Sequence, residues 1–332
     1  MRARRIVGYG AVLAGAALLG TYGTMRAGLW NTDYDTVRAK YAGAPSRFVT
    51  IDGVPLHVRD EGQGPVVVML HGSIVNLHEW DLVADRLKGR YRIVRLDWSP
   101  YGLTGPDPTG VYSTARAAQL LAGLVDRMKL GKFALVSTSN GANVALEYNA
   151  HHPEHVQAMA FSILPLERPS QTRKVDWRIR WMQSFHKTLL PEYHTHLWYR
   201  LILKDTTPPS FEPTDAMVDM MYDMNNLPGA VMRQKAYIDS NTKLFKTSDV
   251  GAIAEKVTAP VLLQWCGYDT VISQGPGASI KRFTHTKVDL VRYPNTGHFP
   301  MWEEPDRFAA DLGKFLDRVS LPAKADGPAR GI

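Results

Sequence analysis

Apolar and polar residues follow two different periods along most of this chain, and these periods predict its fold. Solid apolar runs such as 66–70 and 133–136 are typical of parallel strands that are covered on both faces. Residues 116–128 instead carry apolar side chains at every third or fourth position, after the N-capping residue Ser113, and predict an amphipathic helix. Strands and helices that alternate in this way predict a mostly parallel sheet wrapped by helices on both faces.

The alternation is interrupted once, and the interruption divides the chain. The runs that predict strands are 48–51, 54–59, 66–70, 91–97, 133–136, 156–164, 261–266 and 287–293. The first two are joined at Asp52-Gly53, which is a strong hairpin signal. Residues 165–246 read instead as helices rich in Trp, Met and His, and predict a helical cap over the carboxyl edge of the sheet. The core then comprises 29–164, beginning with a polar connector at 29–45, and 247–319, followed by a flexible tail at 320–332.

The first 28 residues have a pattern of their own. Arginines at positions 2, 4 and 5 precede residues 6–23, which carry no charge. That length lies between the core of a signal peptide and a full membrane span, and no clear cleavage signal follows it. We therefore expect an uncleaved membrane anchor at 1–28, with the N-terminus in the cytoplasm and the remaining chain outside it. The alternative is a signal segment that is cleaved, which would leave a secreted or periplasmic protein.

Composition removes several classes of protein. The chain has 332 residues, 45% of them hydrophobic and 21% charged, which excludes disorder along its whole length. Its net charge of +7 includes four arginines within the first 26 residues, which leaves only +3 for the remainder. Nucleic-acid binding is therefore not expected. Cys266 is the single cysteine, so an intrachain disulfide is impossible.

The candidate chemistry begins at residues 132–146, KFALVSTSNGANVAL, where a strand pattern meets a helix pattern at Ser139. This is the local pattern of a nucleophile elbow, Gly-x-Ser-x-Gly, with Ser137 at the first glycine position and Gly141 at the second. A serine hydroxyl becomes a nucleophile when a base removes its proton and a carboxylate orients that base. Asp269 follows the strand at 261–266, and His298 lies in the loop after the strand at 287–293. The sequence therefore predicts a Ser139-Asp269-His298 triad.

Other groups near these strand ends have different expected roles. The backbone N–H groups of Asn140, directly after the nucleophile, and of Ser73, in the turn after the strand at 66–70, are the candidate oxyanion donors. His71 is expected to be a structural turn residue. The histidines at 151, 152 and 155 and those at 194 and 196 have irregular spacing, so no metal site is expected. No organic cofactor is expected either.

Five segments together resemble the α/β-hydrolase superfamily, in its capped branch with epoxide hydrolases, haloalkane dehalogenases, carbon–carbon bond hydrolases and many bacterial esterases. They are LHGSIVNLHEW (70–80), RLDWSPYGLTGPDP (95–108), LVSTSNGA (135–142), LLQWCGYDTVI (262–272) and YPNTGHFPMWEEPDRF (293–308). The resemblance implies an eight-stranded sheet with a helical cap and the triad named above. Serine at 139 argues against epoxide hydrolase and dehalogenase chemistry, since those enzymes carry an aspartate at the elbow. Ser137 and Ala142 replace glycines of the family pattern and predict a crowded elbow.

The function expected from these residues is hydrolysis of a small, apolar carboxylic ester through an acyl-enzyme. A carbon–carbon bond hydrolase with the same triad is one alternative, and a binding protein with an idle triad is another. In the cap, Trp177, Trp181, Phe185 and Leu189 recur at helical spacing. Such a stripe packs the cap, roofs a substrate pocket or contacts a membrane surface. The sequence does not indicate an oligomeric state.

Overall fold

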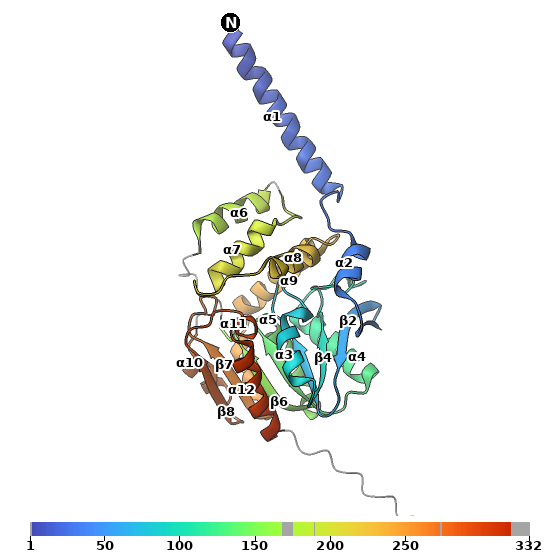
Figure 1. The fold of residues 1–332 in the computed structure, drawn as a ribbon, viewed down its shortest axis with the longest axis vertical. Helices are drawn as coiled ribbons and strands as arrows, with labels where there is room; N and C mark the ends of the chain where they lie inside the picture. Colours follow the sequence, from blue (N-terminus) through green and yellow to red (C-terminus); the bar gives the residue numbers. More distant parts are fainter. Residues whose placement is uncertain (1, 168–174, 189, 273, 320–332) are drawn as a thin grey trace, which may run out of the picture.

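One sheet organises the molecule. A computed structural model describes residues 2–167, 175–188, 190–272 and 274–319, with side chains described from residue 12 onward. Its eight strands are β1 (Ser46–Ile51), β2 (Val54–Glu61), β3 (Val66–Leu70), β4 (Arg92–Leu96), β5 (Phe133–Thr138), β6 (Val156–Ser162), β7 (Val261–Cys266) and β8 (Val288–Tyr293). Their order is β1-β2-β4-β3-β5-β6-β7-β8, with β2 antiparallel to both neighbours and the other pairs parallel. The prediction of an eight-stranded, mostly parallel sheet is confirmed (Figure 1).

Helices cover both faces of the sheet, as the solid apolar strands predict. Successive residues of β3 point to opposite sides, so Val67 and Met69 belong to one hydrophobic cluster and Val68 and Leu70 to the other. The first cluster includes α3 (Asp81–Leu87) and α12 (Pro305–Val319), and the second includes α4 (Thr114–Met128) and α5 (Asn140–His151). The shorter elements are η1 (Leu77–Trp80), η2 (Pro153–His155), η3 (Val250–Lys256), α10 (Pro276–Arg282) and α11 (Pro300–Glu303). Every strand that carries the candidate site is therefore held between two helical layers.

A helical insertion lies between β6 and β7 and covers one end of the sheet (Figure 1). It contains α6 (Trp177–Thr188), α7 (His196–Thr206), α8 (Asp215–Asn225) and α9 (Ala230–Thr247). Asn225 Nδ2 donates a 2.7 Å hydrogen bond to the carbonyl of Ile74, in the turn after β3. The N–H of His298 donates to the carbonyl of Thr206, at 2.8 Å. These two bonds attach the insertion to loops at the carboxyl ends of the strands, where the sequence places the cap.

The N-terminal region differs from the expected plain connector. Residues 29–45 contain α2 (Tyr34–Tyr41), which Asp33 caps by accepting a 2.8 Å hydrogen bond from the Thr36 N–H. Val37 packs into the core cluster from this helix, and one buried residue in eight is too few to produce a visible apolar period. Before it, α1 (Arg2–Arg26) projects away from the body as a long rod (Figure 1). Across the described residues, we find no helix with both the length and the apolar character required to cross a membrane. The predicted tail at 320–332 lies outside the described residues.

Candidate functional site

Ser139 lies at the sharp turn between β5 and α5, as predicted. Its backbone has φ of 50° and ψ of −133°, a conformation that side-chain-bearing residues seldom adopt. The turn is held at both sides, because the Ser139 N–H donates to the carbonyl of Ser162 at 3.3 Å and its carbonyl accepts from the Ala142 N–H at 2.9 Å. Backbone strain of this kind costs about 1 to 3 kcal/mol and is typical of functional turns. The turn therefore has the geometry of a nucleophile elbow.

The tightest point of the elbow is Gly141. A Cβ atom on this residue would lie 2.3 Å from the carbonyl oxygen of His71, in the turn after β3. Only glycine fits there, since no real Cβ approaches an oxygen so closely. Ser137 and Ala142, which replace glycines of the family pattern, are both completely buried and are accommodated on either side. The expected crowding at 137 and 142 stays a prediction, and the glycine at 141 is the one that the crossing with the His71 turn requires.

Asp269 and His298 come from separate loops and meet. His298 Nδ1 lies 2.5 Å from Asp269 Oδ2, and Asp269 Oδ1 accepts hydrogen bonds from the N–H groups of Val271 at 2.6 Å and Ile272 at 2.8 Å. Burial alone would raise the pKa of the Asp269 carboxyl, but the charge and hydrogen bond of His298, together with the two backbone donors, hold that pKa below its ordinary value. A carboxylate in this state is suited to orient the histidine and to stabilise its charged form.

Ser139 and His298 lack the direct contact that Asp269 and His298 make. No hydrogen bond links Ser139 Oγ to the His298 ring in the part of the chain that the structure describes. Both residues lie just past the carboxyl ends of their strands, β5 and β8, on the side that the cap covers. Catalytic hydrogen bonds are often long in unliganded enzymes and tighten when substrate binds. The structure thus brings the acid and the base into contact, and the role of Ser139 as their nucleophile stays a prediction.

The two proposed oxyanion donors lie in turns that touch the elbow. A Cβ on Gly72 would be 3.2 Å from Ser139 Cβ, so the turn after β3 passes directly beside the serine. Among the described residues, the backbone N–H groups of Ser73 and Asn140 have no hydrogen-bond acceptor. The N–H of Asn140 is free because it opens α5. Both donors are therefore available to a negatively charged oxygen.

A side-chain bridge that the sequence analysis missed links these turns to the cap. Asn140 Nδ2 donates to Ser73 Oγ at 2.9 Å, and Tyr101 Oη donates to the same oxygen at 3.0 Å. On its other side, Asn140 Oδ1 accepts a 2.9 Å bond from Asn241 Nδ2, which comes from α9 of the cap. The bridge fixes the Ser73 turn relative to the elbow. Its members are far apart in the sequence, and no local pattern marks them.

Two glutamates, also missed, hold the loops on which the site depends: Glu79 is buried and Glu303 is half-buried. Glu79 is 1% exposed and its Oε2 accepts a 2.9 Å hydrogen bond from the Gly72 N–H. Burial raises the pKa of Glu79 to about 7, against the opposing effects of this bond and the charge of His298. Glu303 accepts from the N–H groups of Gly297 at 2.7 Å and Phe299 at 3.0 Å, on either side of His298, and burial raises its pKa as well. The motifs HEW and WEEP contain these acids, but only the fold reveals what they bind.

His71 has the structural role expected for it. Its Nδ1 donates a 2.6 Å bond to the carbonyl of Gly72, and burial lowers the pKa of its imidazole to about 4 despite the nearby Asp97 carboxylate. Asp97 is itself fully buried and accepts from the Leu77 N–H at 2.7 Å, while its other oxygen contacts His57 Nδ1 at 2.7 Å. This network braces the turn after β3.

The cap contains a cavity of about 410 Å³. It is lined by Ile74, Gln183, His186, Lys187, Pro191, His194, Trp198, Tyr199, Ile202, Val231, Gln234, Lys235, Ile238 and Asp239. Ile74 follows Ser73 directly, so the cavity shares a wall with the proposed oxyanion turn, although Ser139 and His298 are not among its lining residues. Half of its lining residues are apolar and the others are histidines, glutamines and charged residues, which suits a small ligand with an apolar portion.

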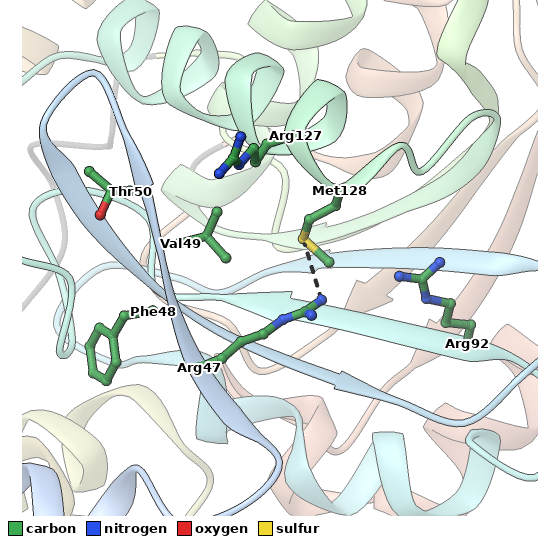
Figure 2. A pocket seen from close by; sticks show the side chains of 7 residues that line it. All are labelled: Arg47, Phe48, Val49, Thr50, Arg92, Arg127 and Met128. Atoms are coloured by element: carbon green, nitrogen blue, oxygen red, sulfur yellow. Dashed lines mark hydrogen bonds between the residues drawn. The ribbon is translucent and has the colours of Figure 1, made fainter.

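A larger hollow of about 570 Å³ lies between β1 and α4 and contains none of the predicted catalytic residues. Figure 2 shows Arg47, Arg92 and Arg127 around it, with Arg47 directed toward Met128. Arg47 and Arg92 both pair with Asp60, at 2.6 and 2.8 Å, so this carboxylate offsets one of the three positive charges. The cap side of the sheet is therefore the candidate site because the predicted catalytic residues lie there, although the hollow beside β1 has the larger volume.

One group of possible metal ligands lies away from this site, at the end of α5. The ligand atoms of His152, Glu154 and His155 all lie within 4.8 Å of one another, because the turn η2 brings the irregularly spaced residues together. His155 Nδ1 is already bonded to Tyr148 Oη at 2.8 Å, and Glu154 is exposed. The expectation that the protein needs no metal and no cofactor stays a prediction.

Comparison with known proteins agrees with this fold. The model of the alpha/beta hydrolase family matches residues 67–311, well over half of the chain. A pimeloyl-[acyl-carrier protein] methyl ester esterase of Nitrosomonas europaea is 25% identical over 256 residues, covering 77% of this chain and 97% of that protein. A 2-hydroxy-6-oxononadienedioate/2-hydroxy-6-oxononatrienedioate hydrolase of Burkholderia vietnamiensis is 24% identical over 288 residues, covering 83% and 96%.

Among solved structures, a membrane phospholipase A shares the fold with a TM-score of 0.65 and 23% identity, over 96% of this chain and 99% of that one. Epoxide hydrolases and a haloalkane dehalogenase are also similar in sequence or structure, as the predicted resemblance implies. These matches support hydrolase activity. The chain belongs to the alpha/beta hydrolase family.

Proposed function

We propose that this protein is a serine hydrolase that cleaves a carboxylic ester through an acyl-enzyme intermediate. The observation that carries the proposal is the 2.5 Å contact between His298 Nδ1 and Asp269 Oδ2, beside a serine held at φ of 50° in a strand-to-helix turn. A histidine with one nitrogen bound to a carboxylate presents its other nitrogen as a base. Oriented bases of this kind activate serine nucleophiles.

The steps follow from these roles. Ser139 Oγ attacks the ester carbonyl as His298 Nε2 removes its proton, and the oxyanion accepts hydrogen bonds from the N–H groups of Ser73 and Asn140. His298 then gives the proton to the leaving alcohol, and the acyl group stays on Ser139. Water, deprotonated by His298, then attacks the acyl carbonyl, the bond to Ser139 Oγ breaks as His298 returns the proton to that oxygen, and the acid leaves. Asp269 remains a carboxylate throughout and stabilises the charged imidazole.

The substrate is proposed to be a small ester with an apolar portion. The 410 Å³ cavity beside Ile74 supports this, because its walls include Trp198, Ile202, Val231 and Ile238. The similarity to the methyl ester esterase of Nitrosomonas europaea points to the same reaction class.

A fluorophosphonate probe tests the nucleophile. We expect the purified chain to be labelled, and labelling to be lost in Ser139→Ala and in His298→Ala. Ser184→Ala is the matched control, since Ser184 is exposed on α6 and outside the proposed machinery. An unlabelled parent protein, or a parent still labelled after Ser139→Ala, would contradict the proposal and favour a binding protein with an idle triad.

Carbon–carbon bond hydrolysis with the same triad is the second candidate. The 24% identity to the oxononadienedioate hydrolase of Burkholderia vietnamiensis, over 96% of that protein, favours it. The two reactions are separated by comparing turnover of a short p-nitrophenyl ester with turnover of a vinylogous diketone. We expect the ester to react faster, and preference for the diketone would replace the first proposal with the second.

The location of the protein is proposed on sequence grounds. Residues 1–28 are proposed to hold it at a membrane, with the hydrolase domain outside the cytoplasm and a cleaved signal as the alternative. The arginines before residue 6, and the exposed Val12, Leu13, Leu18 and Leu19 on α1, support this. Fractionation combined with N-terminal sequencing tests it. A soluble mature chain that begins near Met25 would contradict the anchor.

A further inference from the structure

Exposed large apolar side chains are concentrated on one part of the molecule. Of the fifteen found among the described residues, six lie on α1 and the turn after it, and six more lie in the cap. Those in the cap are Trp177, Trp181, Leu197, Met232, Ile238 and Leu244. Isolated exposed apolar residues are ordinary on protein surfaces, but this distribution is not random. The cap therefore presents an apolar surface that the core does not.

Helix α6 provides the most exposed part of that surface. Ile179 and Met182 face inward and pack with Leu201 of α7. Trp177 and Trp181 are 69% and 64% exposed, so they contribute little to packing of the cap. The Trp181 ring stacks on Phe185 at a centroid distance of 5.7 Å, which places aromatic side chains together on the outer side of the helix. We call this outer side, defined by Trp177, Trp181 and Phe185, the aromatic face.

The charges of α6 are all of one sign. The helix contains Arg178, Arg180 and Lys187 and no acidic residue, although Asp176 just before it pairs with Arg178. Trp side chains beside Arg and Lys on an amphipathic helix are typical of helices that lie in the interface between water and lipid. Aromatic rings favour this interface because one end is apolar and the other is polar.

The N-terminal region also contacts the cap, in the segment that follows α6. Arg26, at the end of α1, forms an ion pair with Glu192 of the cap, and the Trp30 ring meets Tyr193 edge to face at 5.1 Å. Figure 1 shows α1 leaving the body on the cap side. A membrane bound by the uncharged stretch of α1 would therefore lie on the side where the aromatic face is exposed.

We propose that the aromatic face of α6 docks on the surface of a lipid bilayer that contains anionic headgroups. Gln183, His186 and Lys187 of the same helix line the cap cavity, and the exposed Ile238 lines it from α9. Docking therefore brings the wall of this cavity to the lipid surface. If the ester hydrolase function proposed above holds, its substrate is an ester that enters from the bilayer.

A fluorophore on the aromatic face tests docking without relying on activity. Cys266 is the chain's single cysteine and is buried, so Trp181→Cys in the full chain directs an environment-sensitive dye to position 181. Val111→Cys, on an exposed loop of the core, is the matched control because the same α1 is present in both proteins. We expect vesicles of phosphatidylglycerol and phosphatidylcholine to shift the emission at 181 to the blue and to leave 111 unchanged. No shift at 181, or equal shifts at both positions, would overturn the proposal, and the first outcome would favour a protein partner for this face.

Activity provides the second measurement. The double variant Trp177→Ala/Trp181→Ala is expected to hydrolyse an ester carried in these vesicles roughly ten-fold more slowly, because less apolar area enters the interface. Turnover of a soluble p-nitrophenyl ester should stay unchanged, and Leu82→Ala/Val111→Ala should match the parent on both substrates. Equal losses on both esters would overturn the docking role. A parent that cleaves neither ester would contradict the proposed function, while the dye experiment would still decide docking.

Discussion

Glu79 allows a quantitative test of the turn beside the proposed nucleophile. Its carboxyl is 1% exposed, receives one 2.9 Å bond from the Gly72 N–H and has a pKa raised by burial from 4.5 to about 7. Each pKa unit corresponds to about 1.4 kcal/mol, so full ionisation of this buried group destabilises the folded state by about 3 kcal/mol.

The direction of the effect follows from proton binding. Between pH 4.5 and about 7 the folded protein keeps the Glu79 proton that the unfolded chain has already released. Stability contributed by the neutral acid is therefore full below pH 4.5 and falls as the pH rises through 7. Glu79→Gln removes this dependence, since the amide oxygen still accepts from Gly72 but does not ionise.

Urea denaturation of the parent and of Glu79→Gln at pH 4 and pH 8 measures the effect. At each pH, the unfolding free energy of the parent is subtracted from that of the variant. This difference is expected to be about 3 kcal/mol larger at pH 8 than at pH 4. Any cost of burying the extra amide N–H₂ is the same at both pH values and cancels. An unchanged m-value shows that the two unfolding reactions remain comparable. A difference that stays constant between the two pH values would refute the assignment of a buried, titrating carboxyl.

Two further substitutions test the elbow and the triad. Gly141→Ala is expected to destabilise the protein by several kcal/mol and to abolish probe labelling, because its Cβ would lie 2.3 Å from the His71 carbonyl. Gly277→Ala is the control. A Cβ at this position would have nothing within 4 Å, so the unfolding free energy should change by about 1 kcal/mol at most. Equal effects at the two glycines would contradict the close crossing. Asp269→Asn preserves shape but removes the charge that orients His298, and kcat on a p-nitrophenyl ester should fall roughly 10³- to 10⁴-fold. A loss below about ten-fold would remove Asp269 from the triad.

Hydrophobic periodicity was sufficient for most of the scaffold. The strands predicted at 66–70 and 261–266 have the same bounds in the structure as β3 and β7, and the helix predicted after the N-capping residue Ser113 is α4, which that residue caps. A strand that is buried between two helical layers needs an unbroken apolar run, and a helix that packs on one side needs an amphipathic pattern. Both patterns are visible in the local sequence. The short helix α2 left none, because only Val37 of its eight residues is buried.

The candidate site, too, could be predicted from the sequence only in part. The sequence by itself placed Ser139, Asp269 and His298 after three strand ends, because turn residues and strand ends are local features, and parallel strands bring their carboxyl ends to one edge. The tertiary structure decided what joins them: the contact of Asp269 with His298, the bond from Gly72 to the buried Glu79, and the bridge from Asn140 to Asn241. Asn140 and Asn241 are 101 residues apart. The local sequence does not show which group an amide or a carboxyl binds, because the partner is selected only when folding buries both groups. The structure also decided that Trp177 and Trp181 of the predicted stripe stay on the surface, while Ile179 and Met182, which lie outside that stripe, pack inward.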